Sequence, residues 1–284
     1  MGRMSSEVIQ HPLDTTWQSI FTFASWGIVA IMLLIAGRKG VKERTPFYVL
    51  AIVAAGVAAF AEPLYDVAFD LWFYDAHANG TPGAMWSHFT AFGVVQPNWT
   101  HSGYIILYTT ACLYAGRMMY EGRLSRKGLF LVWGLEITAS CVFEVIGTGV
   151  NVYTYYGPYQ LRIWHYPLVI GVLEGTQVIL FTTLAVQLWR RVSSRWGLLG
   201  LLAAFPVTMF GANFGLGAPV IIALHLGHGH FSSGLVWIAT FVSIGLCGLA
   251  VYGASLFLAR PAAEPVDDLE RRAPVATPAA PVAA

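Results

Sequence analysis

Three glutamates stand inside apolar runs that are long enough to cross a bilayer. Glu136 and Glu144 lie in one run, Glu174 lies in the next, and Glu62 ends an earlier run. A charged side chain such as Asp at the centre of a membrane helix costs about 2.5 to 3.5 kcal/mol to insert. Ionisable residues inside membrane helices usually serve a site in the protein interior. These carboxyls are therefore the first candidates for chemistry.

The spacing of the carboxyls predicts a shared cavity. Glu144 lies about one turn before the end of its run, and Glu174 lies nine residues into the next, roughly 13 Å along a helix. A short loop joins the two runs, so the helices are antiparallel neighbours and both carboxyls can project into the same half of the bundle. Glu136 lies eight residues deeper than Glu144, roughly 12 Å along the axis. We expect Glu136 on the floor of that cavity, in contact with the substrate.

Carboxyls in different surroundings can supply both an acid and a base. A carboxyl buried among apolar groups stays protonated near neutrality, whereas one beside an arginine, a histidine or a tyrosine hydroxyl stays ionised. We predict Glu62 or Glu144 as the acid and Glu174 as the base, with Asp66 as a further catalytic candidate. The alternative is that these residues only join helices by hydrogen bonds.

A second acidic pattern lies at the end of the earlier run. Glu62, Asp66 and Asp70 are four residues apart, which places them on one helical face if the helix continues past Pro63. Proline also suits a first turn, so a new helix can begin there. We expect Glu62 to be buried and Asp70 to lie on an exposed acidic surface.

Aromatic residues crowd the loop between the two glutamate-bearing runs. Turned inward, their rings would shield a carbocation or an oxocarbenium ion by cation–π attraction. The alternative is an interfacial aromatic belt. The candidate substrate-binding residues of this loop are Tyr153, Tyr155, Trp164 and Tyr166.

Three histidines stand at the end of the sixth apolar run in an H-x-x-H-x-H pattern. His225, His228 and His230 have the residue type and proximity to bind zinc or copper. A histidine pair in a glycine-rich turn can equally deliver a proton. The carboxyls require no cofactor, and we expect none.

Composition indicates an all-α integral membrane protein. Of the 284 residues, 56% are hydrophobic and only 11% are charged, whereas a soluble domain has about 25% charged residues. The net charge of +1 gives no basis for binding nucleic acid. The expected partners are the lipid bilayer and a lipophilic small molecule. The three cysteines, Cys112, Cys141 and Cys247, fall in apolar runs, so no external disulfide is expected.

Seven runs have the length and apolar character of membrane spans. They cover residues 17–36, 46–64, 101–120, 129–148, 165–189, 196–226 and 233–259. They form a predicted membrane domain of residues 17–260, preceded by an outer segment, 1–16, and followed by a disordered cytoplasmic tail, 261–284. The aromatic-rich connector 65–100 predicts a lid on the bilayer surface. Prolines and glycines in 196–226 predict a kink.

Basic residues predict the orientation of the chain. Fourteen of the sixteen Lys and Arg residues follow the first, third, fifth or seventh run, and only Arg3 and Arg162 lie on the other side. Cytoplasmic loops carry the excess of Lys and Arg, so the N-terminus is predicted outside and the C-terminus in the cytoplasm. No lysine lies in the seventh run, which excludes a rhodopsin-type Schiff base, and no P-loop, G-x-G-x-x-G or G-x-S-x-G motif is present.

Several short motifs resemble the integral membrane family of the avermectin spiroketal cyclase, which is widespread in actinobacteria. They are Glu62-Pro63-Leu64 with the aromatic cluster that follows, a glutamate before Thr148-Gly149 and Tyr153-Thr154-Tyr155, and Tyr166-Pro167-Leu168 with Glu174 six residues on. The resemblance covers about residues 62–189, and Glu62 stands where the family pattern has an aspartate. It implies a membrane enzyme that closes rings on a polyketide. Membrane terpene cyclases and carotenoid hydratases share a similar bundle with paired acids and remain alternatives.

The sequence thus predicts a cofactor-independent cyclase, hydratase or dehydratase for a polyketide- or isoprenoid-type molecule. The alternative is a proton-coupled transporter or a lipid-binding membrane protein that uses the same buried carboxyls. Transporters usually carry repeated halves with broken helices, and no repeat is evident here.

Overall fold

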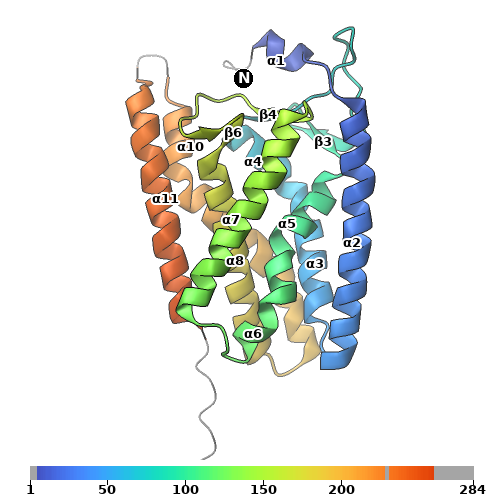
Figure 1. Ribbon diagram of the computed structural model, residues 1–284, viewed down its shortest axis with the longest axis vertical. Coiled ribbons are helices and arrows are strands. Elements are labelled where there is room, and N and C mark those ends of the chain that lie inside the picture. Colours follow the sequence, from blue (N-terminus) through green and yellow to red (C-terminus); the bar gives the residue numbers. More distant parts are fainter. Residues whose placement is uncertain (1–4, 228–229, 259–284) are drawn as a thin grey trace, which may run out of the picture.

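The computed structural model describes residues 5–227 and 230–258 of the chain. Long helices form a bundle, and short strands gather at one end of it (Figure 1). We call this end the strand end and the opposite end, where α6 lies, the α6 end. The predicted tail 261–284 lies outside the described residues.

Twenty elements make up the described chain. The helices are α1 Ser6–Gln10, α2 Thr15–Glu43, α3 Phe47–Ala58, α4 Glu62–Ala68, α5 Thr100–Tyr114, α6 Gly116–Tyr120, α7 Arg126–Gly149, α8 Leu168–Arg191, α9 Leu201–Met209, α10 Ala218–Leu224 and α11 Ser233–Leu256. Tighter or wider helical turns form η1 Ala59–Ala61, η2 Arg195–Gly200 and η3 Phe210–Leu216. The strands are β1 Leu71–Phe73, β2 Ser87–Ala91, β3 Val94–Pro97, β4 Tyr153–Tyr155, β5 Arg162–Ile163 and β6 Tyr166–Pro167.

Six helical segments in the described part of the chain are long and apolar enough to cross a membrane. They are Thr15–Glu43, Phe47–Ala68, Arg126–Gly149, Leu168–Arg191, Arg195–Leu216 and Ser233–Leu256. The predicted span 101–120 differs, because it is divided into α5 and α6 at Ala115. Gly116 follows the break, where glycine weakens a helix, and the Phe47 ring lies 3.4 Å from where its Cβ would be. Helices that could span a membrane are therefore confirmed for six of the seven predicted runs.

Local sequence explains where the main helices begin. The Asp14 carboxylate accepts hydrogen bonds from the backbone N–H groups of Thr16 and Trp17, both at 3.0 Å, and so caps α2. The Ser125 hydroxyl accepts from the Gly128 N–H at 3.1 Å and caps α7 in the same way. Pro63 occupies the first turn of α4, where its missing N–H costs no helical hydrogen bond.

Helix α8 lies at the centre of the bundle. Of its apolar window, 89% is buried by protein, against 33% for α2 and for α11. Helices α5, α7, α9 and α11 pack around it. Two glycines bring α7 close: a Cβ on Gly171 would lie 2.8 Å from Cys141 Sγ, and one on Gly175 would lie 2.7 Å from Ile137 Cγ1. Carboxyls on α7 and α8 can therefore meet across a narrow gap.

The helix that the sequence predicts to kink contains two irregular segments. It begins with the 3-10 turn η2 and passes through α9, which contains Pro206, before the π-helical segment η3. In η3 the Asn213 amide donates to Gln177 Oε1 on α8 at 2.5 Å, and both side chains are fully buried. A π-helical turn inserts an extra residue and often marks a functional position.

The segment 65–100, predicted as a lid on the bilayer surface, folds into the strand end of the bundle. Strand β1 pairs antiparallel with β4, which places Leu71 opposite Tyr155 and Phe73 opposite Tyr153. These four side chains are at most 4% exposed. Strands β2 and β3 form a hairpin beside them. The pairing of β1 with β4 connects the helices that carry Glu62 and Glu144.

Candidate functional site

Carboxyls from three helices line one cavity near the strand end. Glu62 reaches it from α4, Glu144 from α7 and Glu174 from α8. Five tyrosines complete most of its polar wall: Tyr65, Tyr104, Tyr108, Tyr153 and Tyr155. The cavity has a volume of about 40 Å³, which is room for a few water molecules. The predicted convergence of Glu62, Glu144 and Glu174 is present, and the cavity between them, as it stands in this structure, is smaller than a lipophilic molecule.

Glu174 receives four hydroxyl donors from four different elements. Tyr65 of α4 and Tyr108 of α5 donate to Oε1 at 3.3 and 3.4 Å. Ser140 of α7 and Tyr166 of β6 donate to Oε2, the latter at 3.2 Å. Hydrogen bonds from O–H donors stabilise a negative charge on the acceptor. Of the three cavity carboxyls, Glu174 is therefore the one whose negative charge is best stabilised.

Glu144 has fewer donors than Glu174. Tyr155 donates to Glu144 Oε2 at 3.2 Å, and the Tyr153 ring lies close to the same carboxyl. Burial, and next the nearby carboxyl of Glu144, raise the pKa of Tyr153 and of Tyr155 well above the usual range for tyrosine. Both phenols therefore stay protonated and act as donors. With a single well-formed hydrogen bond, Glu144 has less support for a negative charge than Glu174 has.

Glu62 belongs to a small network of its own. The Tyr104 hydroxyl donates to Glu62 Oε2, and the Asp66 carboxyl lies next to that of Glu62. Asp66 accepts from Gln96 Nε2 at 2.6 Å, while its Oδ1 is buried without a well-formed hydrogen bond. Asp66 does not line the cavity. It is placed to influence Glu62 rather than to touch a ligand.

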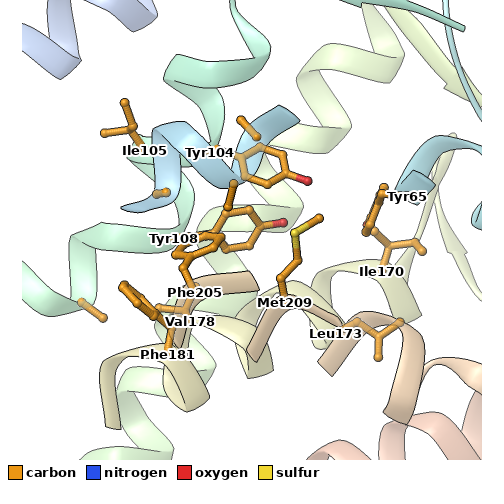
Figure 2. Close-up of a cluster of buried hydrophobic side chains, with 14 of the residues drawn as sticks. Tyr65, Tyr104, Ile105, Tyr108, Ile170, Leu173, Val178, Phe181, Phe205 and Met209 are labelled. Carbon is orange, nitrogen blue, oxygen red and sulfur yellow. The ribbon is translucent and has the colours of Figure 1, made fainter. Parts of the chain in front are cut away.

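Helix α5 supplies one complete wall of the cavity. Thr100, Tyr104 and Tyr108 recur every four residues and so lie on one face, which lines the cavity. Figure 2 shows the Tyr104 and Tyr108 hydroxyls pointing to the same side, towards Tyr65. Below them in this view, Phe205 and Phe181 pack edge to face, with ring centroids 4.7 Å apart.

The charges in this cavity determine what it can do. Among the described residues that line it there is no Lys, Arg or His. Three carboxyls in one low-dielectric cavity repel when all are ionised, so they divide into protonated and ionised members. Glu174, with four donors, fits the ionised role, and Glu144 fits the protonated one. The arrangement suits transfer of a proton to and from a bound molecule.

Glu136 lies outside this cavity. Its carboxyl accepts from the Tyr114 hydroxyl at 2.7 Å and is 4% exposed. The expectation that it forms the cavity floor is therefore wrong, because Glu136 is not among the residues that line the cavity. Its contact with a substrate stays a prediction. Glu136 nonetheless lies on the same stripe of α7 as Ser140 and Glu144, four and eight residues on.

Of the four aromatic residues predicted to bind substrate, three surround the carboxyls. Tyr153 and Tyr155 line the cavity, and Tyr166 contacts Glu174 from outside it. Trp164 is a correction: it is 67% exposed and does not line the cavity. Its backbone has φ of 55° and its indole lies over Gly149, where a Cβ would be 2.7 Å from the ring. The loop therefore turns this side chain outward, over the end of α7.

Arg162 organises the loop between α7 and α8 instead of pairing with a carboxyl. Its guanidinium donates to the backbone oxygens of Gly157 at 2.6 Å, of His165 at 2.7 Å and of Tyr155 at 3.1 Å. Burial lowers the pKa of Arg162. Because Arg162 binds the Tyr155 carbonyl, it fixes the strand that carries the Glu144 donor.

Asp70 corrects a second expectation, because it is buried rather than exposed. It is 3% exposed, and its Oδ1 lies 3.3 Å from His225 Nε2. Its backbone has φ of 50°, and a Cβ on Gly157 would lie 2.4 Å from its Oδ2. The tight turn after α4 therefore directs this carboxylate inward, towards α10.

The metal hypothesis remains a prediction. His225 Nδ1 lies 2.8 Å from the Ile221 carbonyl oxygen, so this nitrogen is a donor, while Nε2 faces Asp70. His228 lies outside the described residues. Among the residues that the structure describes, no group of three His, Cys, Asp or Glu side chains is arranged to hold a metal ion.

Four residues of the candidate site are not among those that the sequence pattern singled out: Tyr65, Tyr104 and Tyr108, which line the cavity, and Ser140, which donates to Glu174. The signals were present. Ser140 stands midway between Glu136 and Glu144 on one helical stripe, and Tyr104 and Tyr108 are four residues apart in an apolar run. A hydroxyl on the same face as a buried carboxyl is a candidate donor to it.

Comparison of the chain with protein-family models, with curated proteins and with solved structures finds no match. The resemblance to spiroketal cyclases therefore stays a prediction. What the chain does is inferred from the geometry of its carboxyl cavity.

Proposed function

We propose that the protein is a membrane-embedded acid–base enzyme that cyclises, hydrates or dehydrates a lipophilic polyketide- or isoprenoid-type molecule. One observation carries the proposal: Glu62, Glu144 and Glu174, from three helices, share one cavity with five tyrosines. Buried carboxyls in unequal surroundings are the usual source of an acid and a base at the same pH. The resemblance to spiroketal cyclases agrees with this chemistry.

The roles follow from the hydrogen bonds. Glu144, with Tyr155 as its one well-placed donor, gives its proton to a carbonyl, hydroxyl or alkene of the substrate. Glu174, held by Ser140 and three tyrosines, accepts the proton that the closing hydroxyl or the adjacent carbon releases. Proton transfer by positioned groups contributes about 10² to 10⁴ in rate. The tyrosine rings attract the cationic centre that forms between the two steps.

We also propose a topology of seven crossings with the N-terminus outside. Helices α5 and α6 together would form one crossing, the third along the chain, in addition to the six single segments. They run end to end from the strand end to the α6 end (Figure 1). The ends of α2, α7 and α8 that carry basic residues all lie at the α6 end. The positive-inside rule then assigns this end to the cytoplasm and the strand end, with the cavity, to the outside.

The test is turnover by membranes that contain the protein. Polyketide dihydroxy-ketones and isoprenoid precursors are incubated with these membranes, and products are identified by mass spectrometry. We expect a product of unchanged mass, or of a mass changed by one water, with wild type and none with Glu174→Gln. The variant must retain the elution profile and melting temperature of wild type. Full activity of a folded Glu174→Gln protein would remove this residue from the mechanism.

A second function is favoured by the size of the cavity. A volume of about 40 Å³ suits water and protons, as in a proton-coupled transporter. Proteoliposomes with a pH-sensitive dye inside distinguish the two. The enzyme moves no net protons across the bilayer while product forms, whereas the transporter acidifies or alkalises the lumen when a gradient of its solute is applied.

A further inference from the structure

The carboxyl cavity is closed on most sides, and the exposure of its wall shows where it opens. Of the fifteen lining residues, twelve are buried and only Gly103, Leu107 and Phe143 are partly exposed. Gly103 and Leu107 lie on α5, and Phe143 lies on α7. The partly open side of the cavity is therefore the boundary between these two helices.

At the strand end, the described residues that line the cavity are all buried. Leu71 and Phe73 of β1 and Tyr153 and Tyr155 of β4 cover the cavity there, and each is at most 4% exposed. The Trp99 indole packs on Phe73, with ring centroids 5.5 Å apart. A ligand arriving from the aqueous side would have to separate the paired strands.

The boundary between α5 and α7 is open beside Gly103. Helix α7 is drawn against α8 by Gly171 and Gly175, while α5 packs along α3, and Figure 1 shows α7 running obliquely past α5. A Cβ added to Gly103 would meet no atom within 4 Å. The side chains of Leu107 and Phe143 that line the cavity beside Gly103 are apolar, and the Phe21 ring of α2 packs on Phe143, with ring centroids 5.3 Å apart. An apolar chain can occupy such a gap without losing hydrogen bonds to water.

We propose that the ligand of the carboxyl cavity enters sideways from the bilayer, between α5 and α7, past Gly103, Leu107 and Phe143. The ligand class is a narrow, mostly apolar molecule that carries a carbonyl, hydroxyl or alkene at the end that reaches Glu144 first. The route follows from the exposure of the cavity wall, and only the reaction at its end depends on the proposed function. Gly103 leaves the passage at its widest, and larger side chains at this position would fill it in proportion to their size.

A membrane-soluble carboxyl reagent tests the route without knowledge of the substrate. Dicyclohexylcarbodiimide dissolves in lipid and reacts with protonated carboxyls. The carboxyl O–H adds across one C=N bond and the acyl group then moves to nitrogen, so the peptide gains the whole mass of the reagent. A cationic, water-soluble carbodiimide serves as the aqueous probe. Protein in vesicles is treated with either reagent, and peptides containing Glu62, Glu144 and Glu174 are analysed by mass spectrometry over time.

We expect the lipid-soluble reagent to label Glu144 and the water-soluble one not to. Gly103→Ala, Gly103→Leu and Gly103→Trp should lower the labelling rate in order of side-chain size. Gly103→Trp should lower it at least about tenfold, which corresponds to about 1.4 kcal/mol, because the indole must move aside before the reagent can pass. Gly248→Trp on α11 is the matched control, since a Cβ there also meets nothing within 4 Å. Leu107→Trp fills the same passage from the next turn and serves if the Gly103 variants unfold.

Three outcomes would overturn the route: no labelling of the cavity carboxyls in folded wild type, equal labelling by the aqueous reagent, or unchanged labelling in both Gly103→Trp and Leu107→Trp. Failure of the proposed function looks different. In that case the passage variants still block labelling, while Glu174→Gln and wild type give the same products from every precursor. The two proposals can therefore fail separately.

Discussion

Helix α7 carries two buried carboxyls on one stripe, and their surroundings differ. Glu144 faces a cavity that it shares with Glu62, Glu174 and tyrosines. Glu136, two turns away, accepts a hydrogen bond from the Tyr114 hydroxyl and does not line that cavity. The helical period places both residues on the same stripe of α7, so the sequence gives no reason to distinguish them. The difference shows that the elements packed across from a stripe, here α4, α5 and α8, decide which of its carboxyls can meet a ligand.

Substitution of Glu144, the member of this pair that lines the cavity, should have the largest effect. Glu144→Gln keeps the shape but removes the acidic proton, so turnover should fall by about 10² to 10⁴. Initial rates in proteoliposomes check this, with the substrate identified by the precursor screen. The melting temperature is the control for folding. If Glu144→Gln retains more than half of the wild-type rate, the contrast between the two glutamates has no catalytic meaning.

The second largest effect should come from disturbing the close packing of α7 against α8, next to Glu174. Gly175→Ala places a methyl group 2.7 Å from Ile137 Cγ1 and 3.0 Å from the Ile137 backbone nitrogen, and such overpacking costs about 1 to 3 kcal/mol. Gly134→Ala on α7 meets nothing within 4 Å and is the matched control. Denaturant titration in mixed micelles measures both. Equal stability of the two variants would mean that α7 and α8 can separate without cost.

A smaller effect is expected for the donor to Glu144. Tyr155→Phe removes the hydroxyl that lies 3.2 Å from the carboxyl, and a hydrogen bond of this kind contributes about 0.5 to 1.5 kcal/mol. The rate should fall by the corresponding small factor while substrate binding is kept. A KM that rises at constant kcat would instead assign Tyr155 to binding alone.

Glu136→Gln should have the smallest effect of the series. A glutamine oxygen still accepts from Tyr114, so stability should change by at most about 1 kcal/mol, and the rate should stay close to that of wild type. The same rate assay and denaturant titration apply. A loss of turnover as large as that of Glu144→Gln would place Glu136 in the mechanism after all.

The sequence predicted the helical membrane fold and the meeting of Glu62, Glu144 and Glu174. Both depend on regularities within single helices: apolar length, the period of 3.6 residues, and a short loop that makes neighbours antiparallel. Interruption of the third run at Ala115 was not predictable in this way. It accompanies the packing of Phe47 against Gly116, a contact between distant parts of the chain.

The wrong expectations for residues at the site also arise from contacts between distant parts of the chain. Trp164 was expected at the cavity and Asp70 at the surface, and each has a backbone with positive φ that reverses the direction of its side chain. The loops reach these conformations because β1 pairs with β4 and Arg162 binds three carbonyl groups. Such contacts between segments far apart in sequence leave no periodic signal. The volume of the cavity likewise depends on how side chains from several elements fit together.

The central place of α8 predicts how differently the spans should tolerate substitution. By hydropathy α8, α2 and α11 are similar, at 1.8, 2.2 and 2.1. Yet most of α2 and α11 is exposed on the outside of the bundle, where surrounding lipid would accept any apolar side chain, whereas α8 is buried among other helices. Exchanges among Leu, Ile, Val and Phe should therefore be nearly silent along the outer faces of α2 and α11 and damaging along α8. In a saturation library, α8 would stand out as the most restricted of these three spans.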